Sequence, residues 1–194
     1  MADFEICNLK CSIKLRTHVS FQALQDKCKI KSWTCKCYNS YIVIKPGQSL
    51  RFIIFKPKYH SSQTHINLTG VRTFLLLESA LELLSSFLEV SQKFMNWTLD
   101  NISGKSNTLL SGITPTKTIN LHSLLKAIKQ LDKENNIAAR LHSDSYAALI
   151  LKQRYTTLLV YPSAKIVVIG AKDIDRILDI IDKVSLAGKN VLLA

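Results

Sequence analysis

The sequence lacks the short motifs by which common enzyme classes are recognised. It contains no GxxxxGK[ST] or GxGxxG phosphate-binding loop, no HExxH metal motif and no GxSxG nucleophile turn. Its five histidines have no motif partner, and the adjacency of His142, Ser143 and Asp144 along the chain does not make a catalytic triad. We therefore expect a protein that is not an enzyme and that needs no cofactor.

The chain also lacks an uninterrupted apolar segment. Its most apolar stretch, residues 74–90, contains Glu78, Glu82 and Glu89, which are costly inside a bilayer. The opening residues, MADFEIC, do not show the basic and then apolar pattern of a signal peptide. We expect a soluble intracellular protein with no membrane partner.

Cysteines are few, odd in number and confined to the start of the chain: Cys7, Cys11, Cys28, Cys35 and Cys37. An odd set in a chain of 194 residues favours free thiols in a reducing compartment over a disulfide framework. The alternative is a zinc site, but Cys35-x-Cys37 is a weak spacing and His18 is the only nearby imidazole. We expect thiols packed as small apolar groups, and no metal.

Positive charge is in large excess, and most of the excess lies in the first part of the chain. The formal net charge is +12 at pH 7. Residues 1–72 hold 12 Lys and Arg against 3 Asp and Glu, whereas residues 73–194 hold 14 against 11. This bias suits a polyanion, either nucleic acid or an anionic membrane surface. The alternative is a basic protein whose charge serves solubility alone.

The hydrophobic pattern predicts the same order of elements twice. In the first half we expect a strand at 4–15, a helix at 21–28, strands at 32–45, 49–55 and 66–68, and a helix at 74–90. In the second half we expect a strand at 94–102, a loop at 103–117, a helix at 121–131, strands at 146–151, 156–161 and 165–169, and a helix at 173–186. Each half then has the order β-α-β-β-β-α, and the repeats span residues 1–91 and 92–194.

Short segments match between the two halves. Asn8 in Cys7-Asn8-Leu9 corresponds to Asn96 in Met95-Asn96-Trp97, and Leu68-Thr-Gly-Val-Arg72 corresponds to Val168-Ile-Gly-Ala-Lys172. A tandem duplication accounts for these matches. Two such units sharing a sheet would have helices on one face and leave the other face open for binding.

The segment YTTLLVYPSAKIVVIGAK, from Tyr155 to Lys172, resembles the strand, turn and strand of the TATA-box-binding protein family. The family's segment ends in Thr-Gly-Ala-Lys, and this one ends in Ile-Gly-Ala-Lys. Phe52–Phe55 and Leu68–Gly70 resemble the same pieces of the first repeat, and the likeness in element order covers about residues 4–187. The resemblance implies an α+β saddle: two pseudo-symmetric repeats forming one curved antiparallel sheet, with helices on the convex face.

The same resemblance implies a function. The concave face would lie in the minor groove of A/T-rich double-stranded DNA, where aromatic wedges enter between base steps and bend the duplex. The protein would be a transcription initiation factor that recruits transcription machinery, in the nucleus or at a site of viral transcription. Its partners would include a TFIIB-like factor and RNA polymerase machinery, although the edge that would receive that factor offers only Asp144 as an acidic residue.

The motif match places aromatic residues at the wedge positions. Phe55 and Tyr161 occupy one position in each repeat, Tyr146 occupies the partner position in the second repeat, and Tyr38 is the candidate in the first. Tyrosine can stack, but its hydroxyl needs a partner when it is buried. The alternative is that these side chains are ordinary strand aromatics that cover the sheet.

Polar residues of the family match supply the contacts to base edges. Asn8 and Asn96 match paired central asparagines, which can donate to the acceptors of A·T pairs, and Thr69 matches a groove-facing threonine. Two residues depart from the family pattern: Ile169 replaces the second threonine, and the carboxylate of Asp100 near the centre would be repelled by DNA. We therefore expect an altered or relaxed sequence preference.

Basic residues would contact phosphates through counterion release, without reading bases. Lys152 and Lys165 match basic positions of the second repeat, and Lys45 and Arg51, with Lys56 and Lys58 nearby, are candidates in the first. The predicted DNA-binding set is completed by Lys10 and Thr98. The alternative function is a docking or protein-interaction module that uses the same fold without TATA specificity.

Overall fold

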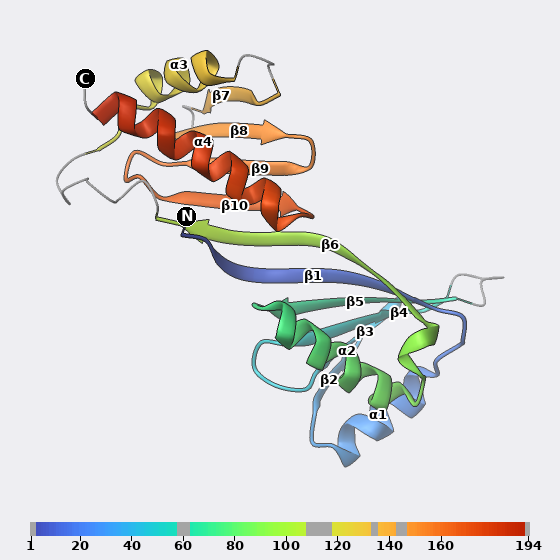
Figure 1. The fold of residues 1–194 in the computed structure, drawn as a ribbon. Coiled ribbons are helices and arrows are strands. Elements are labelled where there is room, and N and C mark those ends of the chain that lie inside the picture. The colour runs from blue at the N-terminus through green and yellow to red at the C-terminus, as the bar shows by residue number, and fades with distance from the viewer. Residues whose placement is uncertain (1–2, 58–62, 108–117, 133–135, 143–146, 193–194) are drawn as a thin grey trace. The chain divides into compact units, whose positions relative to one another are not determined.

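The computed structural model describes residues 3–57, 63–107, 118–132, 136–142 and 147–192. Its strands lie in the sheet order β2-β3-β4-β5-β1-β6-β10-β9-β8-β7, with antiparallel pairing from β2 to β1 and from β6 to β7 (Figure 1). The chain divides into two compact units, an amino-terminal unit of Asn8–Asp100 and a carboxyl-terminal unit of Met1–Cys7 with Asn101–Ala194. The unit boundaries fall inside β1 and β6, so each of these strands contributes residues to both units.

The amino-terminal unit contains most of β1 (Glu5–Leu15), α1 (Phe21–Ile30), β2 (Thr34–Cys37), β3 (Tyr41–Lys45), β4 (Arg51–Phe55), β5 (Thr64–Val71), α2 (Phe74–Leu88), the short η1 (Gln92–Phe94) and the start of β6 (Met95–Ser106). Both helices begin at a side-chain cap. Ser20 accepts a hydrogen bond from the Ala23 amide, and Thr73 accepts one from the Leu76 amide. The two helices expected from the hydrophobic spacing are therefore confirmed.

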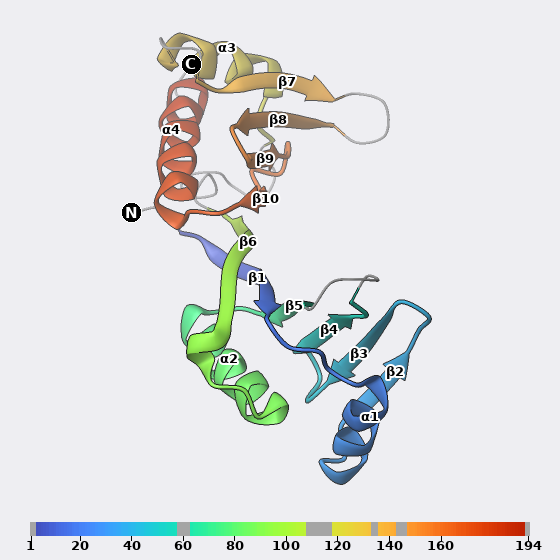
Figure 2. The same cartoon turned by 90° about the vertical axis from the view of Figure 1, so that its right-hand side faces the viewer.

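The carboxyl-terminal unit contains the rest of β6, α3 (Leu121–Leu131), β7 (Ala138–His142), β8 (Ala148–Gln153), β9 (Thr156–Val160), β10 (Ile166–Ala171) and α4 (Ile174–Leu192). The Asn120 side chain caps α3 by accepting from the His122 and Ser123 amides. Figure 2 shows α3 and α4 on one side of the strands of this unit. The α+β class and the antiparallel sheet are as expected.

The predicted element order is wrong by one strand in each repeat. The segment expected as one strand at 32–45 forms β2 and β3, and β7 was not expected at all. Both β2 and β7 are edge strands with mostly exposed or half-buried side chains, so they carry little hydrophobic alternation for a sequence pattern to detect. Ser103–Ser106, expected as loop, continue β6 and pair with β10.

Alternation along the strands gives each unit one buried face. In the amino-terminal unit the side chains at alternate positions of β1 and β3–β5 pack against both helices; they include Leu9, Cys11, Ile13, Ile42, Ile44, Phe52, Ile54, Ile66 and Leu68, all fully buried. Leu24 and Cys28 of α1 and Leu84 and Phe87 of α2 meet them from the helix side. Burying each such leucine or phenylalanine contributes about 2 kcal/mol. The opposite face of the strands is left for other contacts.

A bulge interrupts this alternation at the same place in each unit. Cys11 pairs with Leu68 and Leu9 with Val71, so β5 has one residue more than β1 across the interval. β10 has the same extra residue, since Val168 pairs with Gly104 and Ala171 with Ile102. Gly70 and Gly170 carry the bulges with φ of 89° and 81°, a conformation in which a side chain is strained.

Gly70→Ala is expected to lower the free energy of unfolding by about 2 kcal/mol or more, because a left-handed alanine is strained and its Cβ would overlap the Ser49 carbonyl oxygen. The matched control is Gly47→Ala, whose Cβ would have no neighbour within 4 Å. Denaturant unfolding of the two variants measures the difference. Equal stability of both variants would contradict the assigned role of Gly70.

Candidate nucleic-acid interface

The strand face opposite α1 and α2, which we call the open face of the amino-terminal unit, combines basic, aromatic and small polar side chains. Its residues are Asn8, Lys10, Ser12 and Lys14 of β1; Tyr41, Val43 and Lys45 of β3; Arg51, Ile53 and Phe55 of β4; His65, Asn67 and Thr69 of β5; and Asn96, Thr98 and Asp100 of β6. On β1 and β3–β5 these residues alternate with the buried side chains. On β6, Asp100 contacts Ser12 and Thr98, and Asn96 lines a hollow together with Lys14. Three of the amino-terminal residues predicted to contact DNA are not on these strands: Tyr38 lies beyond the end of β2, Lys56 lies beyond the end of β4 with its ammonium over the Phe21 ring of α1, and Lys58 lies outside the described residues. The other amino-terminal candidates lie on them.

Three aromatic rings form a row at the end of this face. Tyr41 pairs directly with Phe55 across β3 and β4, with ring centroids 5.9 Å apart. Tyr38 stacks on the other side of Tyr41 at 4.5 Å, and its amide donates to the Tyr41 carbonyl. The motif match in the sequence did not identify Tyr41. The β-branched residues that follow it, Ile42 to Ile44, indicate that Tyr41 begins a strand and could have pointed to it. Tyr38 is therefore the outer ring, and Tyr41 is the direct neighbour of Phe55.

The Asn8 side chain is attached to the β5 bulge. Its Oδ1 accepts from the Gly70 amide at 2.8 Å and from the Thr69 hydroxyl at 3.1 Å. In the carboxyl-terminal unit Asn101 Oδ1 accepts from the Gly170 amide at 2.7 Å. The structural counterpart of Asn8 is therefore Asn101, and the predicted pairing of Asn8 with Asn96 is wrong. The three-residue match around Asn96 was too short to align the two halves of the sequence. The β1–β5 and β6–β10 registers align them through the bulge in each unit.

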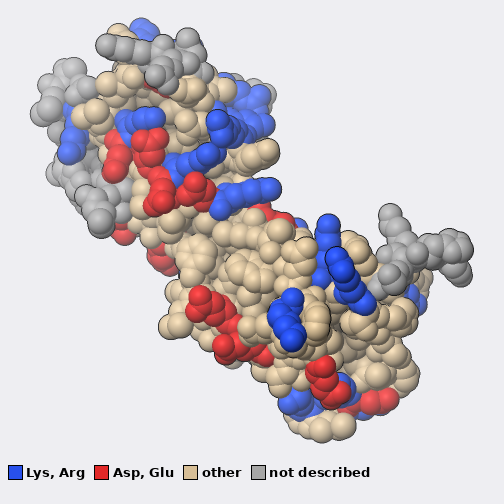
Figure 3. Space-filling model, turned by 45° about the vertical axis from the view of Figure 1, so that its right-hand side comes forward, with Lys and Arg blue, Asp and Glu red and all other residues tan. Residues whose placement is uncertain are grey.

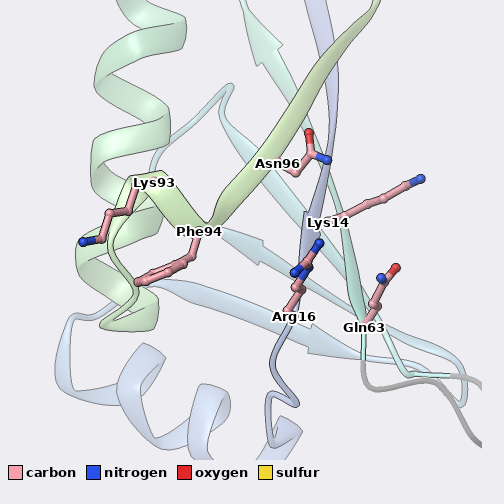
Figure 4. Close-up of a pocket in the computed structure, with 6 residues that line it drawn as sticks. All are labelled: Lys14, Arg16, Gln63, Lys93, Phe94 and Asn96. Atoms are coloured by element: carbon pink, nitrogen blue, oxygen red, sulfur yellow. The ribbon is translucent and has the colours of Figure 1, made fainter.

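Asn96 lies instead in a basic hollow of about 280 Å³ near the end of the open face, lined also by Lys14, Arg16, Gln63, Lys93 and Phe94 (Figure 4). Figure 4 shows Lys14, Arg16, Gln63 and Asn96 close together, with the Lys93 ammonium directed away from them. None of the described residues that line the hollow is acidic. Lys14 and Arg16 were not predicted, although basic residues at alternate positions of β1 indicate one charged strand face.

The carboxylate of Asp100, on β6, contacts Ser12 of β1 and Thr98 of β6. The Ser12 hydroxyl donates to Asp100 Oδ2, and the Thr98 hydroxyl lies 3.5 Å from Asp100 Oδ1. Ser12 also lies 3.3 Å from Asn67 Oδ1. This cluster gives the open face a group of acceptors among its cations. Thr98, predicted as a DNA contact, is thus a neighbour of the one acidic side chain in the set.

The open face of the carboxyl-terminal unit holds the other predicted residues. Lys152 of β8 pairs with Thr157 and Ala138, and Tyr161 and Lys165 lie at the two sides of the β9–β10 turn, where their backbones bond at 3.0 Å. Ile169 pairs with Thr157 as Thr69 pairs with Arg51, so the two residues are equivalent. Tyr146, Lys58 and Asp144 lie outside the described residues.

Charge is distributed over both units. Figure 3 shows Lys and Arg side chains in separate groups on each unit, with Asp and Glu groups beside them. In the carboxyl-terminal unit Arg140 and Lys152 line a hollow of about 350 Å³, while Lys105 is paired with Glu5 at 2.9 Å. Arg140 of β7 and Lys152 of β8 therefore face a hollow, whereas Lys105 of β6 is held by an acidic partner.

The cysteines do not form a metal site in the described residues, where no group of three His, Cys, Asp or Glu side chains is placed to hold an ion. All five are free thiols. Burial raises the pKa of Cys11 to about 11, with a further contribution from Asp100. Burial and the neighbouring thiols of Cys28 and Cys37 raise the pKa of Cys35 to about 12. Within the described part of the chain, no helix has the length and apolar character needed to cross a membrane.

Comparison with known proteins shows the fold and nothing finer. No protein-family model matches the chain, and no curated protein matches its sequence. Among solved structures the chain is similar to the TBP of Methanococcus jannaschii, with a TM-score of 0.63 and 16% identity over 97% of this chain and 99% of that one. The regulatory subunit of aspartate kinase from Thermus flavus aligns with a TM-score of 0.25 and 10% identity over 99% of each chain, which does not indicate a shared fold.

We expect an alkylating reagent near pH 8 to modify Cys7 quickly and Cys11 slowly in the folded protein. Cys7 is exposed, whereas Cys11 is buried. The raised pKa of Cys11 also keeps its sulfur protonated, and therefore unreactive, at pH 8. Peptide mapping by mass spectrometry after timed labelling measures both rates. Equal rates in the folded protein would contradict this placement, and equal rates in denaturant serve as the control.

Proposed function

We propose that the protein binds double-stranded DNA through the open sheet face, enters the minor groove and bends the duplex, as a factor of transcription initiation. The observation that carries this proposal is the aromatic row of Tyr38, Tyr41 and Phe55 on a helix-free, basic strand face. The fold shared with a TBP supports it.

The side chains of the open face suit each part of minor-groove binding. Val43 and Ile53, both half-buried, offer an apolar surface to deoxyribose, and the aromatic row offers flat rings that can enter between base steps. Lys45 and Arg51 stand beside them as cations for phosphate. Insertion costs unstacking energy, which contacts with the bent duplex offset.

The bulge asparagines are suited to reading A·T pairs. Because each glycine amide donates to Oδ1, the oxygen of Asn8 and of Asn101 is turned toward the bulge, and the NH2 group of each amide is a hydrogen-bond donor. A·T pairs present only the acceptors adenine N3 and thymine O2 in the minor groove. We accordingly propose a preference for A/T-rich DNA.

The same proposal extends to the protein's setting: it is not an enzyme, it acts in the nucleus or at a site of viral transcription, and it recruits a TFIIB-like factor and RNA polymerase machinery. The support is the resemblance to the TATA-box-binding family together with the fold. The second candidate is a nucleic-acid docking or protein-interaction module without TATA specificity. It is favoured by Asp100 and by Ile169, 46% exposed, where a groove-reading face would carry polar donors.

A gel-shift and fluorescence-energy-transfer assay on A/T-rich and G·C-rich duplexes at a stated salt concentration tests the first candidate. We expect tighter binding and a bend with A/T-rich DNA. Tyr38→Ala should reduce the bend and weaken binding about tenfold, since stacking on one aromatic ring contributes about 1–3 kcal/mol. The control is Phe74→Ala, an exposed aromatic at the start of α2. Binding without a bend or a base preference would leave the docking module.

Lys14→Gln and Arg16→Gln are expected to weaken binding to all duplexes alike and each to reduce the slope of log K against log salt by about 1, because each would remove one phosphate contact. Lys29→Gln, an exposed lysine of α1, makes the same charge change on the helix side. Titrations at several salt concentrations give the slopes. An unchanged slope in both Lys14→Gln and Arg16→Gln would show that the basic hollow does not contact DNA.

A further inference from the structure

The open face of the amino-terminal unit has a group of hydrogen-bond acceptors beside its basic residues. The group consists of the Asp100 carboxylate, the Ser12 hydroxyl and the Asn67 side-chain oxygen. Asp100 and Asn67 are both half-buried, so they are accessible from this face. A surface that contacts phosphate alone needs cations and hydrogen-bond donors, so such acceptors would not contribute to it.

Counting protons shows that the group has acceptor capacity left. The Ser12 hydroxyl has one proton, which it shares between Asp100 Oδ2 and Asn67 Oδ1. The Asp100 carboxylate has about four lone-pair positions. Ser12 occupies one of them, and the Thr98 hydroxyl, at 3.5 Å, takes at most a second. At least two acceptor positions on Asp100 therefore remain for a ligand.

The edges of the two base pairs respond to this group in opposite ways. An A·T pair presents only acceptors in the minor groove, so it would face Asp100 acceptor to acceptor. A G·C pair adds the guanine N2 amino group, which is a donor.

We infer that Asp100, positioned by Ser12, selects a G·C pair at one position of an otherwise A/T-rich site by accepting a hydrogen bond from guanine N2. This inference rests on the proposed binding of the minor groove by the open face. Thr98 acts as a positioning residue, since its hydroxyl lies 3.5 Å from the carboxylate as a hydrogen-bond donor.

The experiment uses the full chain and a set of A/T-rich duplexes in which each position in turn carries G·C. At the position that binds best, guanine is then replaced by inosine, which lacks only the N2 amino group. We expect inosine to weaken binding about tenfold, the cost of one lost hydrogen bond to a charged acceptor. Asp100→Ala should bind guanine and inosine duplexes equally, because alanine has no acceptor for the guanine N2 amino group. Asp26→Ala, the same change on the exposed side of α1, should keep the difference.

The outcomes separate this inference from the proposed function. Tight binding of A/T-rich DNA with no effect of inosine at any position overturns the inference and leaves the proposed function intact. Retention of the guanine preference in Asp100→Ala assigns the preference to another residue and also overturns it. Binding to no duplex overturns both.

Discussion

The candidate interface depends on one interaction that occurs in both units, the hydrogen bond from a bulge glycine to an asparagine side chain. Gly70 donates to Asn8 and Gly170 donates to Asn101, at 2.8 Å and 2.7 Å. The bulge adds one residue to β5 and to β10, so the buried positions on both sides of it still face the helices. The bond holds that extra residue in place and orients an amide on the open face at the same time.

The two units share this frame but have different chemistry around it. The residue before the glycine is Thr69 in one unit and Ile169 in the other, so the hydroxyl that Asn8 accepts from has no counterpart at position 169. Across β1 and β5, Ser12 faces Asn67, while the equivalent register in the carboxyl-terminal unit pairs Lys105 with Val167. A duplicated backbone thus carries a polar, acceptor-bearing surface on one unit and a more aliphatic one on the other.

Much of the fold could be predicted because it follows from local sequence. The helices have apolar residues at helical spacing and capping residues before them, and the central strands alternate strongly. The edge strands β2 and β7 could not be predicted, because a strand with few buried side chains carries no strong alternation. For the same reason Tyr41 was hidden within a segment interpreted as one long strand.

The amino-acid sequence by itself determined the duplication, the class of fold, the excess of basic residues and the face on which most candidate residues lie, because strand alternation and charge are properties of short segments. Only the tertiary structure decided which residues are partners. Asn101, sixty-nine positions before Gly170, became the counterpart of Asn8 through strand register, and Ser12 met Asp100 across eighty-eight positions. Such pairings depend on where a bulge shifts the register between strands, and no short segment contains that information.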